Sequence, residues 1–108
     1  MFMNSYQAAA RETAVYPADM GVVYTALGLN GEAGEIADKV KKVLRDNNGE
    51  MSLETQDEVM QELGDVLWYV AMLAWELGYT LRDVASANIA KLSDRQDRKV
   101  LHGSGDKR

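Results

Sequence analysis

Residues 20–45 decide the fold, and they read MGVVYTALGLNGEAGEIADKVKKVLR. Apolar residues recur along this stretch at alternating spacings of four and three, which is the period of one face of an α-helix. The stripe consists of Val22, Ala26, Leu29, Ala33, Ile36, Val40 and Val43. This pattern predicts a long helix that packs one side against a partner helix.

Residues 53–77 supply the partner, because they carry the same alternating spacing. Their stripe consists of Val59, Leu63, Val66, Val70, Leu73 and Leu77. Between the two stretches lies Asp46-Asn47-Asn48-Gly49, whose residues tolerate or favour left-handed backbone angles. The sequence therefore predicts two helices joined by a short turn and folded back on each other as a hairpin.

The N-terminal boundaries follow from residues that begin or end helices. A short first helix is expected to start at Asn4 or Ser5, whose side chains can accept a backbone N–H, and to stop before Pro17. Asp19 is then expected to cap the second helix.

The C-terminal boundaries are read in the same way. Ser52 offers the cap of the third helix and Gly78 a stop for it. Thr80 and Asp83 resemble a capping box for a fourth helix that reaches about Arg98, followed by a polar tail. The predicted fold class is all-α, an antiparallel bundle of about four helices with a long central hairpin, completed by oligomerisation.

Length and composition narrow the possible functions. The 108 residues are expected to form a single domain, residues 1–108. The chain has no cysteine, which excludes thiolate metal sites and makes the cytoplasm the expected compartment. A formal net charge of −5 argues against nucleic acid as a partner, and no apolar run is long enough for a membrane span.

Two similar acidic motifs lie on the two long helices. Glu32 and Glu35 are three positions apart, and Glu62 and Asp65 repeat that spacing thirty positions later. Residues three apart on a helix can converge on one ligand. The motifs are equally distant from the Asn48-Gly49 turn, so an antiparallel hairpin would bring all four carboxylates to one level beside the seam.

Four crowded carboxylates raise one another's pKa values unless a cation neutralises them. An all-oxygen site suits Mg²⁺, with Mn²⁺ as a possible substitute. The glycines Gly34 and Gly64, inside the two motifs, could allow close approach of a ligand or a neighbouring helix. The competing interpretation is that the acids are solvated and form surface pairs such as Glu35 with Lys39. The symmetric pairing beside a seam favours the metal site.

The motifs resemble those of the MazG-like family of all-α nucleoside triphosphate pyrophosphohydrolases, whose signature is ExxE on one helix and ExxD on the next. The surrounding residues 27–42 and 62–69 are also similar to the sequences of family members. The resemblance continues into Asn88-Ile-Ala-Lys-Leu92 and Arg95. Many members carry a further acid where this chain has Gly31, so the number of metal ions stays open.

The resemblance implies magnesium-dependent attack of water on the α-phosphorus of a nucleoside or deoxynucleoside triphosphate, which releases pyrophosphate and leaves the monophosphate. It also implies a homodimer or homotetramer. The residues expected to hold the metal and to form the catalytic set are Glu32, Glu35, Glu62 and Asp65.

Five further residues are candidates for binding the substrate. Asn88 and Lys91 match an Asn-x-x-Lys pattern of the family, and Arg95 lies on the same side of the fourth helix. Lys39, one turn beyond Glu35, could meet a phosphate or form an intrahelical pair. Trp68 could stack on a base, although aromatic residues beside a helix seam are more often core or interface. The structural alternative for the fourth helix is that Asn88 is a hydrogen-bonded amide in the core and that Lys91 and Arg95 are ordinary solvated charges.

Two other functions compete with hydrolysis. A non-catalytic helical interaction module would explain the apolar stripes but not the paired acidic motifs, and it predicts no dependence on magnesium. A di-iron carboxylate bundle would need Glu-x-x-His pairs, and neither motif contains histidine.

Overall fold

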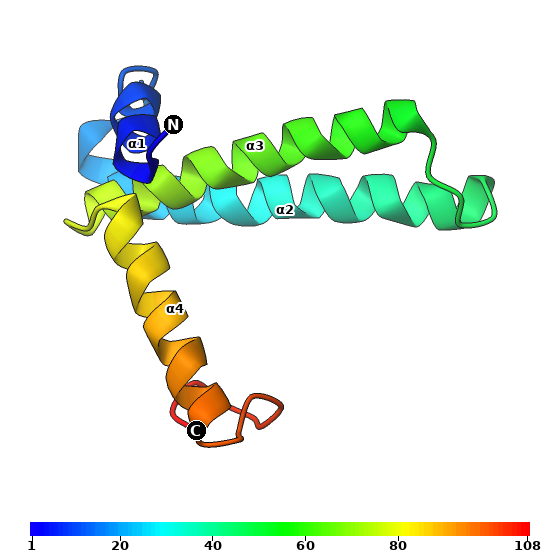
Figure 1. The fold of residues 1–108 in the computed structure, drawn as a ribbon. Coiled ribbons are helices and arrows are strands. Elements are labelled where there is room, and N and C mark those ends of the chain that lie inside the picture. Colours follow the sequence, from blue (N-terminus) through cyan, green and yellow to red (C-terminus); the bar gives the residue numbers. More distant parts are fainter.

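The computed structural model describes residues 1–108 and contains helices but no strands. Figure 1 shows α2 and α3 side by side as a long antiparallel hairpin, with α1 beside one end of it and α4 leaving that same end at a steep angle. The all-α prediction is confirmed. None of the helices combines the length and the apolar character needed to cross a membrane. The elements are α1 (Met3–Arg11), the 3₁₀ helix η1 (Ala18–Met20), α2 (Gly21–Asp46), α3 (Leu53–Glu76) and α4 (Leu81–Asp97).

The predicted signals around the long helices are confirmed. The hydroxyl of Ser52 accepts the backbone N–H of Thr55 at 3.1 Å and so caps α3. Thr80 and Asp83 form the reciprocal capping box of α4. Gly78 follows α3 with φ of 84°, which explains why glycine stands there.

Two predicted N-terminal caps are wrong. α1 begins at Met3 without a side-chain cap, and the Asn4 side chain instead accepts the backbone N–H of Arg82 at 3.1 Å, in the first turn of α4. Asp19 lies within η1, and α2 begins at Gly21 without a side-chain cap. The Asn4 side chain is thus used in a tertiary contact and Asp19 in a preceding helical turn, neither of which local capping rules consider.

The seam of the hairpin follows the predicted stripe on α2 from Ile36 onward and departs from it nearer the N-terminus. There Glu32 is half-buried and Thr25 is buried, whereas the predicted Ala33 and Ala26 are exposed. Spacings of four and three average 3.5 residues per turn, so the stripe drifts by about 20° per heptad around a straight helix of 3.6 residues per turn. A predicted stripe that is correct at one end is therefore displaced at the other.

The same displacement affects α3. Leu63 and Leu77 belong to its predicted stripe but are 54% and 55% exposed. The neighbouring Glu62 and Glu76 are half-buried instead. Thus Glu32 and Glu62 lie within the seam and do not merely flank it.

A buried glutamine holds α1, α3 and α4 together at the end of the hairpin. The Gln7 side chain, 3% exposed, donates to the carbonyl oxygens of Ala71 at 3.0 Å and Tyr79 at 3.2 Å. Its amide oxygen accepts the backbone N–H of Leu81 at 3.0 Å. Ala71 and Leu81 also belong to the small apolar cluster that forms the core beside it. The direction in which α4 leaves the hairpin is therefore set by a polar contact as well as by packing.

One chain alone has a small core. Only 10 of its 108 residues are buried. The radius of gyration of the Cα atoms is 16.7 Å, against about 13 Å for a compact globular domain of this length. Large apolar side chains along the hairpin are exposed, among them Leu27, Leu44, Met60, Leu63 and Leu67. A single chain thus leaves extensive apolar surface in contact with water.

Candidate metal centre and adjoining pocket

Three of the four predicted acids come together at the seam. Glu32 of α2 and Glu62 and Asp65 of α3 each offer one carboxylate oxygen, and these three oxygens lie within 4.8 Å of one another. The three-residue spacing on α3 places Glu62 and Asp65 on neighbouring turns, and the antiparallel hairpin brings Glu32 opposite them. Glu32 and Glu62 are half-buried, whereas Asp65 is exposed. The cluster is therefore open to solvent on one side.

The electrostatics of the cluster suit a cation. Partial burial is the main reason that the pKa of Glu32 is raised, and a hydrogen bond with Glu62 and the negative charges of Asp65, Glu62 and Glu35 raise it further. Like charges this close destabilise one another unless a positive charge lies between them. Carboxylate oxygens are the ligands that hard divalent cations such as Mg²⁺ prefer. The donor set thus fits the predicted metal.

Glu35, the fourth predicted acid, lies one turn beyond Glu32. Its side chain is exposed, and the group of three mutually close carboxylates does not include it. It is nevertheless near enough for its charge to contribute to the raised pKa of Glu32. The structure therefore brings together three acids, with Glu35 at the margin.

A pocket of about 310 Å³ adjoins the acids. It is lined by Thr13, Glu32, Asp65, Trp68 and Tyr69. The indole of Trp68 meets the ring of Tyr69 edge to face, with centroids 5.0 Å apart. The sequence singled out Trp68, and the structure places it at the edge of the acidic cluster. An aromatic wall beside a cation site is suited to a ligand that carries both a flat ring and negative charge.

Thr13 was not predicted from the sequence. It follows α1 in a turn, and nothing in its local sequence distinguishes it from an ordinary helix end. Its Oγ1 accepts the N–H of Trp68 at 2.8 Å, and this contact spans 55 positions of the chain. A long-range contact of this kind becomes visible only in the folded structure.

The glycines around the site serve different purposes. A Cβ atom at Gly28 would overlap the ring of Tyr69, so the absence of a side chain lets this ring lie against the backbone of α2. A Cβ atom at Gly34 or Gly64 would meet nothing within 4 Å. No helix of the same chain occupies the space at Gly34 and Gly64, and a ligand or a second chain could approach there.

None of the predicted basic residues forms an ion pair with the four predicted acids of its own chain. Lys39 forms an ion pair with Glu58 of α3 at 3.7 Å, farther along the hairpin. Lys91 and Arg95 belong to α4, which points away from the hairpin (Figure 1), and both contact Asp106 of the C-terminal tail, at 3.0 and 3.1 Å.

Asn88 also lies on α4 and is exposed. The alternative that Asn88 is a satisfied core amide therefore does not apply within one chain. None of the three candidates on α4 is brought to the acids by the fold of a single chain.

Comparison with known proteins agrees with this arrangement. The MazG nucleotide pyrophosphohydrolase domain matches residues 23–100, which contain both acidic motifs. Over 114 aligned positions that cover both proteins in full, the chain is 49% identical to the "Gene 37 protein" of Mycobacterium phage L5. No solved structure gives a significant match. The chain belongs to the MazG nucleotide pyrophosphohydrolase family.

Proposed function

We propose that the protein hydrolyses nucleoside and deoxynucleoside triphosphates to the monophosphate and pyrophosphate, with Mg²⁺ as its cofactor. The observation that carries the proposal is the convergence of Glu32, Glu62 and Asp65 within 4.8 Å, beside a pocket with aromatic walls. Membership of a family of nucleotide pyrophosphohydrolases supports the same reaction class. The cytoplasm, where nucleotide pools lie, is the proposed compartment.

The acidic residues divide into two groups in this proposal. Glu32, Glu62 and Asp65 would hold the metal, and Glu35 would complete the catalytic set from the margin. The bound ion, Mg²⁺ or in its place Mn²⁺, supplies positive charge for the phosphates and lowers the pKa of water. Since the antiparallel hairpin of α2 and α3 sets the backbone positions of the acids before the substrate arrives, less reorganisation would be needed for the reaction.

The substrate would extend from the acids in two directions. The base would enter the pocket beside Trp68, because flat aromatic rings stack on one another. Lys39, one turn beyond Glu35, is proposed to exchange its ion pair with Glu58 for a phosphate group. Asn88, Lys91 and Arg95 are proposed to reach the acids of a second copy, because α4 leads them away from those of their own chain.

A homodimer or homotetramer is the proposed assembly, and the exposed apolar faces of the hairpin support it. Leu27 on α2 is 69% exposed and Leu63 on α3 is 54% exposed. Apolar patches this extensive on one chain are ordinarily covered by another subunit. Light scattering across a tenfold dilution series is expected to show a species of at least twice the 12.0 kDa chain mass. A stable monomer throughout the series would contradict this part of the proposal.

The reaction is tested by pyrophosphate release from a panel of ribonucleoside and deoxyribonucleoside triphosphates, with and without Mg²⁺. The wild type is compared with Glu62→Gln and Asp65→Asn, and Glu54→Gln, in the first turn of the same helix, is the matched control. Release that requires Mg²⁺, is lost in both site variants and persists in the control is expected.

The alternative function, a non-catalytic helical interaction module, predicts a different outcome. In that case no nucleotide would yield pyrophosphate, although all variants are folded, and Mg²⁺ would leave every measured property unchanged. The exposed apolar faces would then be the functional surface.

A further inference from the structure

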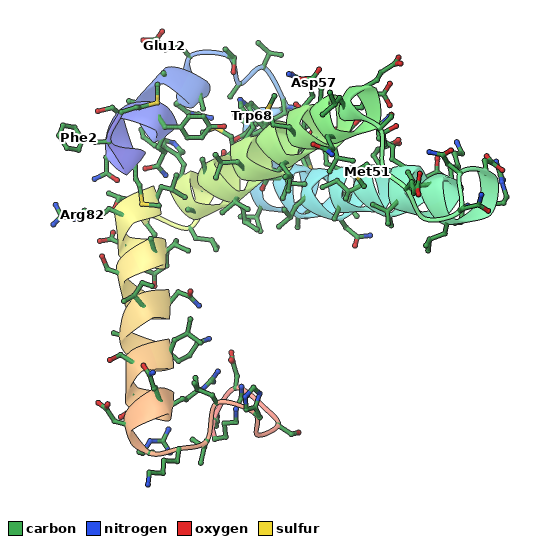
Figure 2. All side chains as sticks on the ribbon, turned by 45° about the vertical axis from the view of Figure 1, so that its right-hand side comes forward. Phe2, Glu12, Met51, Asp57, Trp68 and Arg82 are labelled. Carbon is green, nitrogen blue, oxygen red and sulfur yellow. The ribbon has the colours of Figure 1, made fainter.

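The turn after α1 reaches the wall of the candidate pocket through one hydroxyl group. Thr13 Oγ1 donates its hydrogen to the carbonyl oxygen of Ala10 at 2.7 Å. Thr13 Oγ1 in turn accepts the indole N–H of Trp68 at 2.8 Å. Figure 2 shows Trp68 on α3 beneath the segment that follows Glu12. A residue before α2 therefore touches the aromatic side of a pocket whose acids come from α2 and α3.

The two hydrogen bonds have a fixed direction. An indole N–H can only donate, so its partner must be an acceptor. A hydroxyl has one hydrogen, and that of Thr13 is taken by Ala10, which leaves its lone pairs to face Trp68. The contact thus holds in one orientation of the indole ring, and a ring turned over by half a revolution would lose it.

Two neighbouring rings complete the support of the indole. Tyr16 meets Trp68 edge to face, with centroids 6.3 Å apart and an interplanar angle of 89°. Tyr69 does the same at 5.0 Å and 84°. Edge-to-face contacts restrict the tilt of a ring, and the hydrogen bond to Thr13 restricts its rotation. Trp68 is therefore held by three residues, of which Thr13 and Tyr16 belong to the segment after α1 and Tyr69 is its neighbour on α3.

We infer that Thr13 is a positioning residue that fixes Trp68 as the stacking wall for the base of the nucleotide. The inference rests on the proposed function and adds a determinant of substrate binding to it. Thr13 precedes residues 23–100, the segment matched by the family, so this determinant lies outside the matched region. Because the Thr13 hydroxyl donates to the carbonyl oxygen of Ala10 and the Trp68 indole N–H donates to Thr13, neither of these two side chains keeps a free donor for the base. Recognition at this wall would depend on an aromatic base and would tolerate different bases.

The test compares Thr13→Val, which keeps the shape and removes the hydroxyl, with Thr13→Ser, which keeps the hydroxyl. Thr13→Val is expected to raise KM for the preferred nucleoside triphosphate about threefold to tenfold, the range expected for one lost hydrogen bond. The kcat and the Mg²⁺ concentration for half-maximal activity should change less than twofold, because the acids are untouched. Thr13→Ser is expected to restore KM. Equal KM values in the wild type and Thr13→Val would overturn the inference.

A double-mutant cycle separates positioning from a general loss of stability. Trp68→Phe keeps an aromatic ring and removes the N–H, so adding Thr13→Val to it should leave KM unchanged. If Thr13→Val raises KM by the same factor in both backgrounds, Thr13 does not act through Trp68 and the inference is wrong.

Spectroscopy of Trp68 tests the inference even if the protein hydrolyses no nucleotide. In a Trp75→Phe background Trp68 is the only tryptophan. Thr13→Val is expected to weaken its near-ultraviolet circular dichroism and the fluorescence change caused by a non-hydrolysable nucleoside triphosphate. A nucleotide-dependent signal with no pyrophosphate release would contradict the proposed reaction and leave the role of Thr13 standing. No nucleotide signal in the parent protein would overturn both.

Discussion

Glu32 of α2 and Glu62 of α3 are both half-buried and bring their carboxylates together across the seam of the hairpin, where apolar side chains would ordinarily pack. The pKa of Glu32 is raised, first by partial burial and then by its acidic neighbours, so the ionised form of this side chain costs stability while no cation is bound. The hairpin therefore gives up stability at the level of the candidate site.

This cost leads to a prediction about stability. In EDTA at neutral pH, Glu32→Gln is expected to raise the thermal midpoint by about 3–6 °C, because one of the crowded charges is removed. Saturating Mg²⁺ should stabilise the wild type more than the variant and so reduce or reverse the difference. Differential scanning calorimetry measures both effects. Glu50→Gln, in the exposed turn, is the control, and an equal gain in that variant would show that net charge alone is responsible.

Much of the fold could be predicted from the sequence, because local signals and tertiary structure agree over most of the hairpin. The turn at Asn48 and Gly49, the cap at Ser52 and the capping box at Thr80 all depend on the conformation of a few adjacent residues. The position of the seam was harder to predict, because a displacement of one residue exchanges Ala33 for Glu32 on the inner face.

Part of the candidate site was also predictable, because its acids depend on local helix spacing and on the hairpin. The spacing of Glu62 and Asp65 is a property of one helix, and their meeting with Glu32 needs only an antiparallel hairpin. Thr13 approaches Trp68 through the fold of α1, which no local pattern reveals. The outward course of α4, fixed by Gln7, likewise could not be foreseen from the periodicity of α4 itself.

Gly28 is expected to be intolerant of a side chain. Gly28→Ala would place a methyl group where the ring of Tyr69 lies, so the ring must move and the free energy of unfolding should fall by about 1–3 kcal/mol. Urea unfolding measures the change. The matched control is Gly31→Ala, where a Cβ meets nothing within 4 Å. There the gain in helix propensity should stabilise the protein by about 1 kcal/mol, and a similar loss in both variants would contradict the packing described at Gly28.

Gln7 is expected to stabilise the junction of three helices. Gln7→Ala leaves a buried N–H of Leu81 and the carbonyl oxygens of Ala71 and Tyr79 without their partner. Unsatisfied buried groups cost about 1–3 kcal/mol each, so the variant should be among the least stable single substitutions in the chain. Asn4→Ala, which removes one exposed bond to the same turn of α4, should cost less than about 1 kcal/mol. Equal losses in urea unfolding would argue against the role assigned to Gln7.

The C-terminal tail is expected to be held on α4 in a pH-dependent way. The Lys91 and Arg95 side chains lower the pKa of Asp106 below its ordinary value of 3.8. A lowered pKa in the folded state means that the stabilising contact is complete above the ordinary value and is lost as the pH falls through the lowered one. Hydrogen exchange of residues 99–108 should therefore show constant protection from pH 7 to about pH 5 and a decline at lower pH.

Asp106→Asn provides the comparison for the tail. It should weaken protection of the tail at pH 7, because the two ion pairs with α4 are lost. Asp97→Asn, an exposed acid at the end of α4, is the matched control and should leave the protection unchanged. Protection of the tail that is the same in all three proteins would show that Asp106 does not hold it.

The most direct test of the central claim is hydrolysis of the preferred nucleoside triphosphate in water enriched in oxygen-18, with the products analysed by mass spectrometry. Attack on the α-phosphorus, supported by metal held at Glu32, Glu62 and Asp65, predicts one labelled oxygen in the monophosphate and none in pyrophosphate. The reaction should require Mg²⁺ and be absent in Glu62→Gln. Label in pyrophosphate, release of orthophosphate and diphosphate, or equal turnover by Glu62→Gln would contradict the account.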